Sequence, residues 1–340
     1  MRFGIHLGHQ HLPGESAFER FKEHVEQVRL LRDLGFDSIW AGQHYLAYPL
    51  QFLQTIPLLA RLSAEAGDMF VGTDIVILTV QNPVDIAEQI ATLDIMTGGR
   101  AIFGVGLGYR DTEFDAFGVN RKERVSRFEE ILTIVRRLWT EDSVTFKGKH
   151  FDLRDVRESL RPVQKPHPPI WIGATNDTAI RRAARMGDTW ILTTHASFPT
   201  LARQLEIYKA ALKEAGKPFP KELARVPELY VAEDDETAFR ECREYIVTKY
   251  KAYVAWGQER DVPKEERLDV PFEELARDRF LIGGPERIVQ EIERGHRELG
   301  INHWLFRVQW PGMPQKLVLK TMRILGEQVL PYFHQRYPKA

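Results

Sequence analysis

Short apolar, β-branched runs alternate with longer segments of helical spacing along the whole chain. Eight such runs are present, and each is followed by a segment whose apolar residues recur every three or four positions. The spacing predicts strands at residues 3–7, 37–41, 70–80, 101–105, 170–172, 190–192, 228–231 and 304–308. Strands separated by helices pair in parallel, because a helical crossover returns the chain to the same end of the sheet. Eight such units with no Pro-, Gly- or Ser-rich linker between them predict an α/β fold of one closed (β/α)8 TIM barrel.

Capping signals mark where several of the helices begin and end. Ser16 with Glu19 three residues later is a capping box, and Gly35 supplies the left-handed stop of the same helix. Asn82 followed by Pro83 is typical of an N-cap with proline at the first helical position. These signals support a regular β/α repeat.

Two stretches, at about residues 141–168 and 250–281, exceed the usual length of barrel loops. Residues 144–151 alternate around a Lys-Gly turn and predict a small hairpin in the first stretch. The second stretch is charged and holds two Val-Pro pairs, so it is interpreted either as a lid over the active-site face or as surface decoration. We predict a single domain, residues 1–340, with these two insertions.

Charge and cysteine content exclude several classes of partner. The chain has 47 Lys and Arg against 48 Asp and Glu, a net charge of −1, whereas nucleic acids and anionic membranes require a concentrated positive face. Cys242 is the only cysteine, so no disulfide within the chain or thiolate metal cluster is possible, and we expect it to fill a helix-packing position. Neither a signal peptide nor an apolar run of about 18 residues is found, so we expect a soluble cytoplasmic protein.

Several catalytic motifs are missing from the sequence. It contains no His-Glu-x-x-His, no paired-cysteine zinc pattern and no Gly-x-Ser-x-Gly elbow. We therefore predict no metal site, and an organic cofactor is the natural carrier of the chemistry.

His44 is the first candidate catalytic residue. In barrels of this class the catalytic groups gather at the C-terminal ends of the strands, and His44 follows the second predicted strand. There an imidazole can exchange a proton with a ligand above the barrel. The alternative, a hydrogen-bonded structural histidine, stays open on these residues alone.

Two strand ends offer places for an anionic ligand. Residues 104–110, GVGLGYR, lack the G-x-G-x-x-G spacing of a dinucleotide loop, but their glycines let a ligand approach the backbone. Residues 175–178, TNDT, lead into a helix whose exposed N–H groups attract phosphate, although an ordinary N-cap explains them equally well. Thr73 and Asp74 interrupt an apolar strand and predict a bulge there.

Several segments, taken in order, resemble the bacterial luciferase-like monooxygenases, and the resemblance covers nearly the whole chain. They are FDSIWAGQHY (36–45), VGTDIVIL (71–78), NPVDIAEQIATLDIMTGGR (82–100), the 104–110 loop, WPGMP (310–314) and VLPYF (329–333). Members of that family are eight-stranded α/β barrels that use reduced FMN or the deazaflavin coenzyme F-420. The resemblance implies that the cofactor ring lies over the barrel mouth, that His44 is catalytic and that the Asp74–Ile75 peptide bond is cis.

The resemblance also implies which residues hold the cofactor. We expect its phosphate near the 106–109 and 176–178 segments, and the predicted cofactor-binding residues are Asp74, Ile75, Asn82, Gly106, Leu107, Gly108, Tyr109, Thr175, Asn176, Asp177, Thr178 and Trp190. Gly106 stands where light-emitting members carry a reactive cysteine, so bioluminescence is not predicted.

The leading hypothesis is a two-component monooxygenase of class EC 1.14. Reduced FMN from a separate flavin reductase would react with O2 to oxygenate a small organic substrate, with His44 as proton donor or base. The alternative is an F-420-dependent dehydrogenase or reductase that transfers hydride. A third hypothesis is a non-catalytic flavin-binding protein. Among the aromatic residues, Tyr109 and Trp190 are the candidates for the substrate pocket, and the helices around 58–62 and 86–90 would suit a homodimer.

Overall fold

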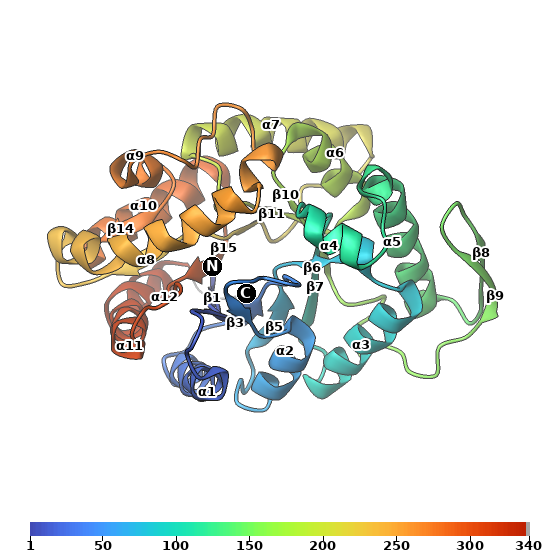
Figure 1. The fold of residues 1–340 in the computed structure, drawn as a ribbon, viewed down its shortest axis with the longest axis horizontal. Helices are drawn as coiled ribbons and strands as arrows, with labels where there is room; N and C mark the ends of the chain where they lie inside the picture. The colour runs from blue at the N-terminus through green and yellow to red at the C-terminus, as the bar shows by residue number, and fades with distance from the viewer. Residues whose placement is uncertain (338–340) are drawn as a thin grey trace.

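Eight parallel strands close into a barrel at the centre of the fold. The computed structural model describes residues 1–337. In order around the ring the strands are β1 (Arg2–His6), β3 (Ser38–Ala41), β5 (Phe70–Thr73), β7 (Ala101–Gly106), β10 (Ile170–Ala174), β11 (Thr189–Leu192), β12 (Ala224–Arg225) and β15 (His303–Arg307). Pairing of β7 with β10 and of β1 with β15 closes the ring and confirms the predicted (β/α)8 fold (Figure 1).

Helices surround this barrel on all sides (Figure 1). They are α1 (Ala17–Asp33), α2 (Thr55–Ser63), α3 (Pro83–Met96), α4 (Asp111–Ala116), α5 (Arg124–Thr140), α6 (Asp177–Met186), α7 (Phe198–Glu214), α8 (Asp235–Ala255), α9 (Phe272–Ala276), α10 (Pro285–Leu299), α11 (Gln315–Ile324) and α12 (Leu330–Arg336), with short turns η1 (Leu78–Val80), η2 (Arg121–Glu123), η3 (Gln258–Asp261) and η4 (Leu325–Val329). The predicted caps form: Ser16 Oγ accepts from the Glu19 N–H at 3.3 Å, and the Asn82 side chain accepts from the Val84 N–H at 2.9 Å.

The barrel interior is filled by side chains below its mouth. Trp40 and Trp171 stack there with ring centroids 5.0 Å apart, within a buried apolar cluster separate from the larger core between strands and helices. The Trp40 indole N–H donates to Ser38 Oγ at 2.8 Å, and a Cβ on Gly72 would lie 2.1 Å from the same indole. Only glycine leaves room for this packing, which fills this part of the barrel interior.

The seventh barrel strand is not where the sequence places it. The barrel uses β12 at residues 224–225, whereas β13 (Leu229–Val231) pairs in parallel with β14 (Leu281–Gly283) outside the ring. Pro227 separates the two segments, and a proline has no N–H to continue a ladder. The prediction of a barrel strand at 228–231 is therefore wrong by about one strand length.

The predicted third strand is broken into three pieces. β5 ends at Thr73, β6 (Val76–Ile77) resumes against β7, and η1 follows. The interruption falls at Thr73 and Asp74, where the polar pair predicts an irregularity, and the Asp74–Ile75 bond is cis.

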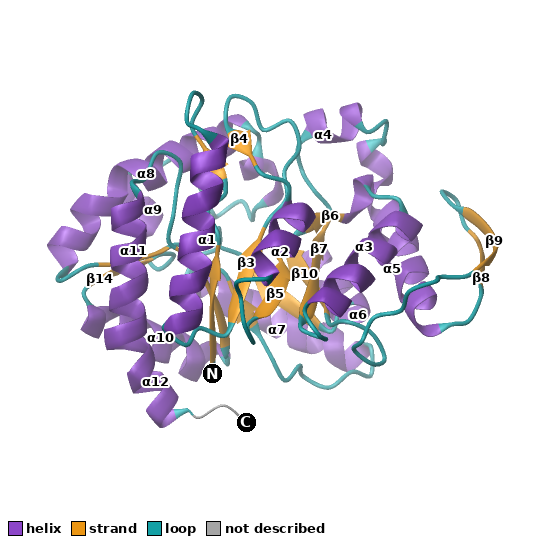
Figure 2. Cartoon of the chain, turned by 90° about the horizontal axis from the view of Figure 1, so that it is seen from below, coloured by secondary structure: helices purple, strands orange, loops and turns teal. Residues whose placement is uncertain are grey.

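The two long insertions differ in position. Strands β8 (Val144–Lys147) and β9 (Asp152–Val156) form the predicted hairpin, which stands away from the barrel beside α5 (Figures 1 and 2). Residues 250–281 contain the end of α8, η3 and α9, and Tyr253, Gln258 and Asp261 of this stretch line the cavity at the barrel mouth. The small antiparallel pair β2 (Gln10–His11) and β4 (Gln51–Phe52) lies at the same end, with β4 and α4 opposite the N-terminus in Figure 2.

The apolar residues that suggest a dimer interface are instead buried in the core of this chain. Leu58, Leu59 and Leu62 of α2 and Ile86 and Ile90 of α3 are all buried. They give the expected dimer no support. Over residues 1–337, the helices are too short or too polar to traverse a lipid bilayer.

Candidate active site

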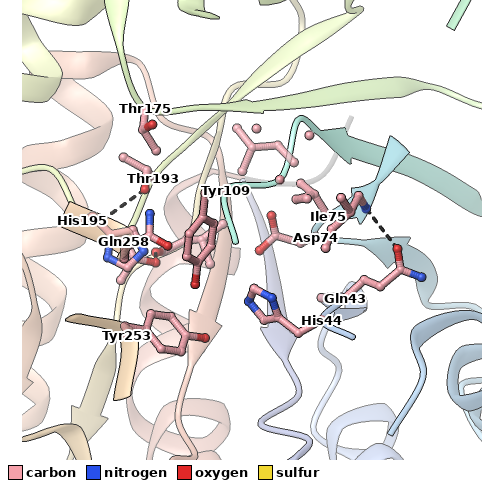
Figure 3. A pocket seen from close by; sticks show the side chains of 18 of the residues that line it. Gln43, His44, Asp74, Ile75, Tyr109, Thr175, Thr193, His195, Tyr253 and Gln258 are labelled. Carbon is pink, nitrogen blue, oxygen red and sulfur yellow. Dashed lines mark hydrogen bonds between the residues drawn. The ribbon is translucent and has the colours of Figure 1, made fainter. Parts of the chain in front are cut away.

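A cavity opens at the C-terminal ends of the barrel strands, where catalytic groups of such barrels gather. Strand ends and the loops after them supply most of its walls, and α8 and η3 add one side. In Figure 3, His44, Gln43 and Asp74 lie across the cavity from His195, Tyr253 and Gln258, with Tyr109 between the two groups. Residues at or after the ends of all eight barrel strands therefore meet at one place.

His44 is held by a buried carboxylate. Its Nδ1 lies 3.0 Å from Oε1 of Glu113, which is 1% exposed and also accepts from the Tyr45 N–H at 2.9 Å. Arg110 lies 3.4 Å from the same oxygen. A carboxylate at Nδ1 keeps the imidazole proton on that nitrogen and leaves the Nε2 lone pair available as a base.

Aromatic rings enclose this imidazole on several sides. The nearest rings belong to Phe52, Tyr109, Tyr253 and Trp256, with centroids 5.5 to 6.2 Å from that of His44. Such a shell excludes water and strengthens each electrostatic interaction inside it. The position of His44 at the second strand end was predicted, whereas Glu113 was missed because nothing local distinguishes it from any acidic residue in the first turn of a helix.

The cavity floor combines His6, Asp74 and Arg307. His6 Nε2 lies 3.0 Å from the Asp74 carbonyl oxygen, and an Arg307 nitrogen lies 3.4 Å from the Asp74 carboxylate. Burial raises the pKa of Asp74 and lowers the pKa of His6 well below its usual value. His6 is therefore a neutral, structurally engaged imidazole.

A buried ion pair forms the wall contributed by α8. Lys249 donates to Glu228, whose other carboxylate oxygen accepts from the Trp310 indole at 2.6 Å. Burial lowers the pKa of Lys249 to about 8. Lys249 lines the cavity, and sequence reasoning missed it because it is one of many charges on a long helix.

Four polar atoms around the cavity have no hydrogen-bond partner within residues 1–337. They are Nδ1 of His9, Oη of Tyr109, Nδ1 of His195 and Nε of Arg307. Burial lowers the pKa of His9 and of His195 and raises that of Tyr109, so all three are neutral at physiological pH. These four atoms are free to bond to a ligand rich in polar atoms, such as a flavin ring system.

Glycines let the walls approach one another closely. A Cβ on Gly106 would lie 2.8 Å from Cδ1 of Ile75, and Gly108 has φ +74°. Both belong to the 106–109 segment predicted to hold a cofactor, and the whole segment lines the cavity.

The predicted anion-binding end of the cavity lies where β10 leads into α6. Thr175 and Asn176 line the cavity there, and Asn176 also caps α6 by accepting from the Ala179 N–H at 3.0 Å. Arg124, from the start of α5, lines the same end. Sequence reasoning missed Arg124, since the residue is far from Thr175 along the chain.

Four predicted cofactor-binding residues do not line the cavity. Asn82 is occupied as the N-cap of α3, Asp177 pairs with Arg203 at 2.8 Å, and Thr178 is an exposed residue in the first turn of α6. Trp190 is fully buried and packs against Tyr208 on the helix side of the barrel. Successive side chains of β11 point to opposite faces of the strand. Because Ile191 faces the cavity, the neighbouring Trp190 faces outward, which is why it does not line the cavity as predicted. The other predicted residues, His44, Asp74, Ile75, Gly106, Leu107, Gly108, Tyr109, Thr175 and Asn176, all line it.

Neither metal nor thiol chemistry has a site in the described residues. No group of three or more His, Cys, Asp or Glu side chains in residues 1–337 is arranged to hold a metal ion. Cys242 is buried, and burial raises the pKa of its thiol to about 12, as expected of a packing residue.

Several proteins with similar sequences or structures are named as F420-dependent enzymes or were solved with FMN or F420 bound. Residues 1–303 match the family described as luciferase-like monooxygenase. An F420-dependent glucose-6-phosphate dehydrogenase of Microbacterium testaceum is 30% identical over 322 residues, covering 91% of this chain and 92% of that protein.

Two solved structures show the same fold. Monooxygenase RslO1 from Streptomyces bottropensis has a TM-score of 0.84 and 25% identity, covering 98% of this chain and 100% of that one. The oxygenating constituent of 3,6-diketocamphane monooxygenase from Pseudomonas putida, in complex with FMN, has a TM-score of 0.77 and 20% identity, covering 97% and 98%.

Proposed function

The chain belongs to the luciferase-like monooxygenase family, and we propose that it is an oxidoreductase that uses reduced FMN and O2 to oxygenate a small organic substrate. The contact between His44 and Glu113, beside a cavity with unpartnered polar atoms, carries this proposal. The similarity to monooxygenase RslO1 over the whole chain supports the choice of reaction.

The residues present suit a flavin. Tyr109, His9 and Arg307 would hydrogen-bond the ring system, and Arg124, Thr175 and Asn176 would hold its phosphate. When bound, reduced FMN supplies two electrons and the reaction with O2.

The chain's own residues have three tasks in this scheme. The aromatic side chains of Phe52, Tyr253 and Trp256 exclude water from the space beside His44. His44 moves a proton at Nε2, and Glu113 holds the imidazole in the required tautomer and stabilises it when it is protonated. No nicotinamide-binding fingerprint occurs in the sequence, so we propose that a separate flavin reductase supplies the reduced cofactor.

A second candidate keeps the site and changes the chemistry. An imidazole whose Nδ1 faces a carboxylate is well suited to take a proton from a substrate hydroxyl as hydride leaves for coenzyme F-420. The 30% identity to an F420-dependent dehydrogenase supports this alternative.

Cofactor titration under controlled oxygen separates the candidates. The purified chain is titrated with FMN, anaerobically reduced FMN and F-420, and binding is followed by fluorescence. We expect reduced FMN to bind most tightly and its oxidation in air to be faster with protein and substrate than without. Tight F-420 binding with oxygen-independent turnover would favour the dehydrogenase, and flavin binding with no turnover in a substrate panel would favour a carrier.

A further inference from the structure

The carboxylate of Asp261 occupies the anion-binding end of the cavity. Its Oδ1 lies 3.1 Å from Arg124 and its Oδ2 lies 3.3 Å from Arg121. The Thr175 hydroxyl donates to the backbone oxygen of the same residue at 2.5 Å. Asp261 ends η3, so the charged insertion that follows α8 places an acidic side chain where two arginines and the start of α6 converge.

These donors are the ones a phosphate would use. Guanidinium groups bind carboxylates and phosphates with the same planar geometry, and the first turn of α6 adds exposed N–H groups. The neighbouring acidic residue, Asp177, is turned away to Arg203, so it does not compete for the site. Asp261 is therefore the one carboxylate among the cavity-lining residues that contacts Arg124.

We propose that Asp261 is an internal competitor for a phosphate subsite made by Arg121, Arg124 and Thr175. The ligand is a phosphate ester, and its identification with the cofactor's phosphate rests on the proposed function. When the phosphate ester binds, its phosphate replaces the Asp261 carboxylate on the same arginines. The ion pairs of Asp261 must therefore break before the phosphate can contact those arginines.

The exchange also releases the segment that carries Asp261. Trp256, five residues earlier, lies over the Arg110 guanidinium at 4.3 Å and beside His44. The other ion pair between η3 and the barrel side joins Arg260 and Asp111, whose side chains are both more than half exposed. An exposed pair contributes little, so the ion pairs of Asp261 are the stronger electrostatic contacts of η3.

Binding of FMN and of riboflavin, which lacks the phosphate, tests this proposal. Calorimetric titrations compare wild type with D261N and D261A, and we expect both variants to bind FMN at least about tenfold more tightly, because a charge-assisted contact no longer has to be broken. Riboflavin affinity should change by less than about twofold. The matched control is E265Q, which removes the same charge from the same insertion at a residue that pairs with Arg203 at 3.1 Å, outside the proposed subsite, and should leave FMN affinity within about twofold.

The opposite result has a clear meaning. Weaker FMN binding in both Asp261 variants would show that the carboxylate positions the arginines for the phosphate, and unchanged binding would show that it does not compete; either result would overturn the proposal. An equal gain in E265Q would also overturn it, because the effect would then be one of general charge. Circular dichroism and thermal melting confirm that each variant is folded.

Inorganic phosphate separates this proposal from the proposed function. Its binding is measured by phosphorus NMR on wild type and D261A without flavin. Tighter phosphate binding in D261A supports the competitor even if no flavin or deazaflavin binds, in which case only the proposed cofactor fails. Equal phosphate binding in the two proteins overturns the competitor whichever cofactor the enzyme uses.

Discussion

Nδ1 of His44 lies 3.0 Å from Oε1 of Glu113, a carboxylate that the fold removes almost completely from solvent. Arg110 and the Tyr45 N–H approach the same oxygen, so the carboxylate is held in place without occupying the cavity side of the imidazole. In this arrangement Nδ1 of His44 is held by Glu113, and Nε2 is left available for proton transfer. It makes the proton transfer of His44 depend on a residue that no ligand in the cavity needs to touch.

Replacing either member of this pair should lower kcat. We expect H44A to lose about 10²–10⁴-fold in kcat, because general acid–base catalysis contributes that much. E113Q keeps the shape of the side chain but no longer stabilises the protonated imidazole, and we expect a loss of about tenfold or more with KM nearly unchanged. Steady-state kinetics with a turned-over substrate measure both.

The controls distinguish proton transfer from a structural defect. Added imidazole should restore part of the activity of H44A and none of that of E113Q, while E113D should recover more activity than E113Q. Full turnover by H44A, with flavin binding unchanged, would remove His44 from the mechanism.

Gly106 sets the position of Ile75 in the cavity wall. A Cβ at this position would lie 2.8 Å from Cδ1 of Ile75, so we expect G106A to push Ile75 toward the ligand and to lower the free energy of unfolding by about 1–3 kcal/mol. Flavin affinity should fall as well. Urea unfolding and flavin titration of G106A and of the double variant G106A/I75V test the cause: the smaller valine should restore both, and no recovery would argue against this contact.

The barrel was predictable because its signals are local and repeated. Apolar runs, helical spacing and caps such as Ser16 and Asn82 each depend on neighbours within a few residues. Strand ends then placed His44 and the 106–109 segment at the mouth. The prediction of the seventh strand was wrong because two short apolar stretches flank Pro227. Only the closure of the barrel determines which of the two stretches pairs with its strands.

The missed site residues come from contacts distant in the sequence. Arg124, Lys249 and Asp261 reach the cavity from α5, α8 and η3, and Glu113 of α4 contacts His44 without lining the cavity. Each is an ordinary charge in its own segment. Trp190 fails for a different reason, since strand alternation assigns it to the helix side once Ile191 faces the cavity. Local sequence patterns therefore predict where the mouth of the barrel lies. Which charged side chains surround it depends on tertiary packing, which those patterns do not contain.

Buried histidines should make stability fall in mild acid. Burial lowers the pKa of His24 to about 4, and its Nε2 has no partner within residues 1–337. Below its unfolded pKa of about 6.5 the unfolded chain takes up a proton that the folded chain refuses, so the free energy of unfolding decreases from about pH 6.5 down to about pH 4. One such group contributes a slope of at most about 1.4 kcal/mol per pH unit.

Urea unfolding of H24Q between pH 7 and pH 4.5 measures this contribution. The slope of unfolding free energy against pH should be smaller than in wild type, because one titrating group has been removed. H150Q, on the loop between β8 and β9, is the matched histidine substitution and should retain the wild-type slope. Identical slopes in H24Q and wild type would show that His24 is not a source of acid sensitivity.

The buried pair of Lys249 and Glu228 should be stabilising only as a pair. Both side chains are almost fully buried, and Glu228 also accepts from Trp310, so removing Lys249 leaves an ionised carboxylate without its counter-charge. We expect K249M and E228Q each to lower the free energy of unfolding by about 3–5 kcal/mol, and the double variant to lose clearly less than the sum of the two. Chemical unfolding of the four proteins measures the coupling. R243M provides the comparison, because Arg243 and Glu273 form an ion pair of 2.8 Å with both side chains more than half exposed, and its loss should cost less than about 1 kcal/mol. Strict additivity of K249M and E228Q would mean that the two charges are stabilised independently by their surroundings rather than by each other.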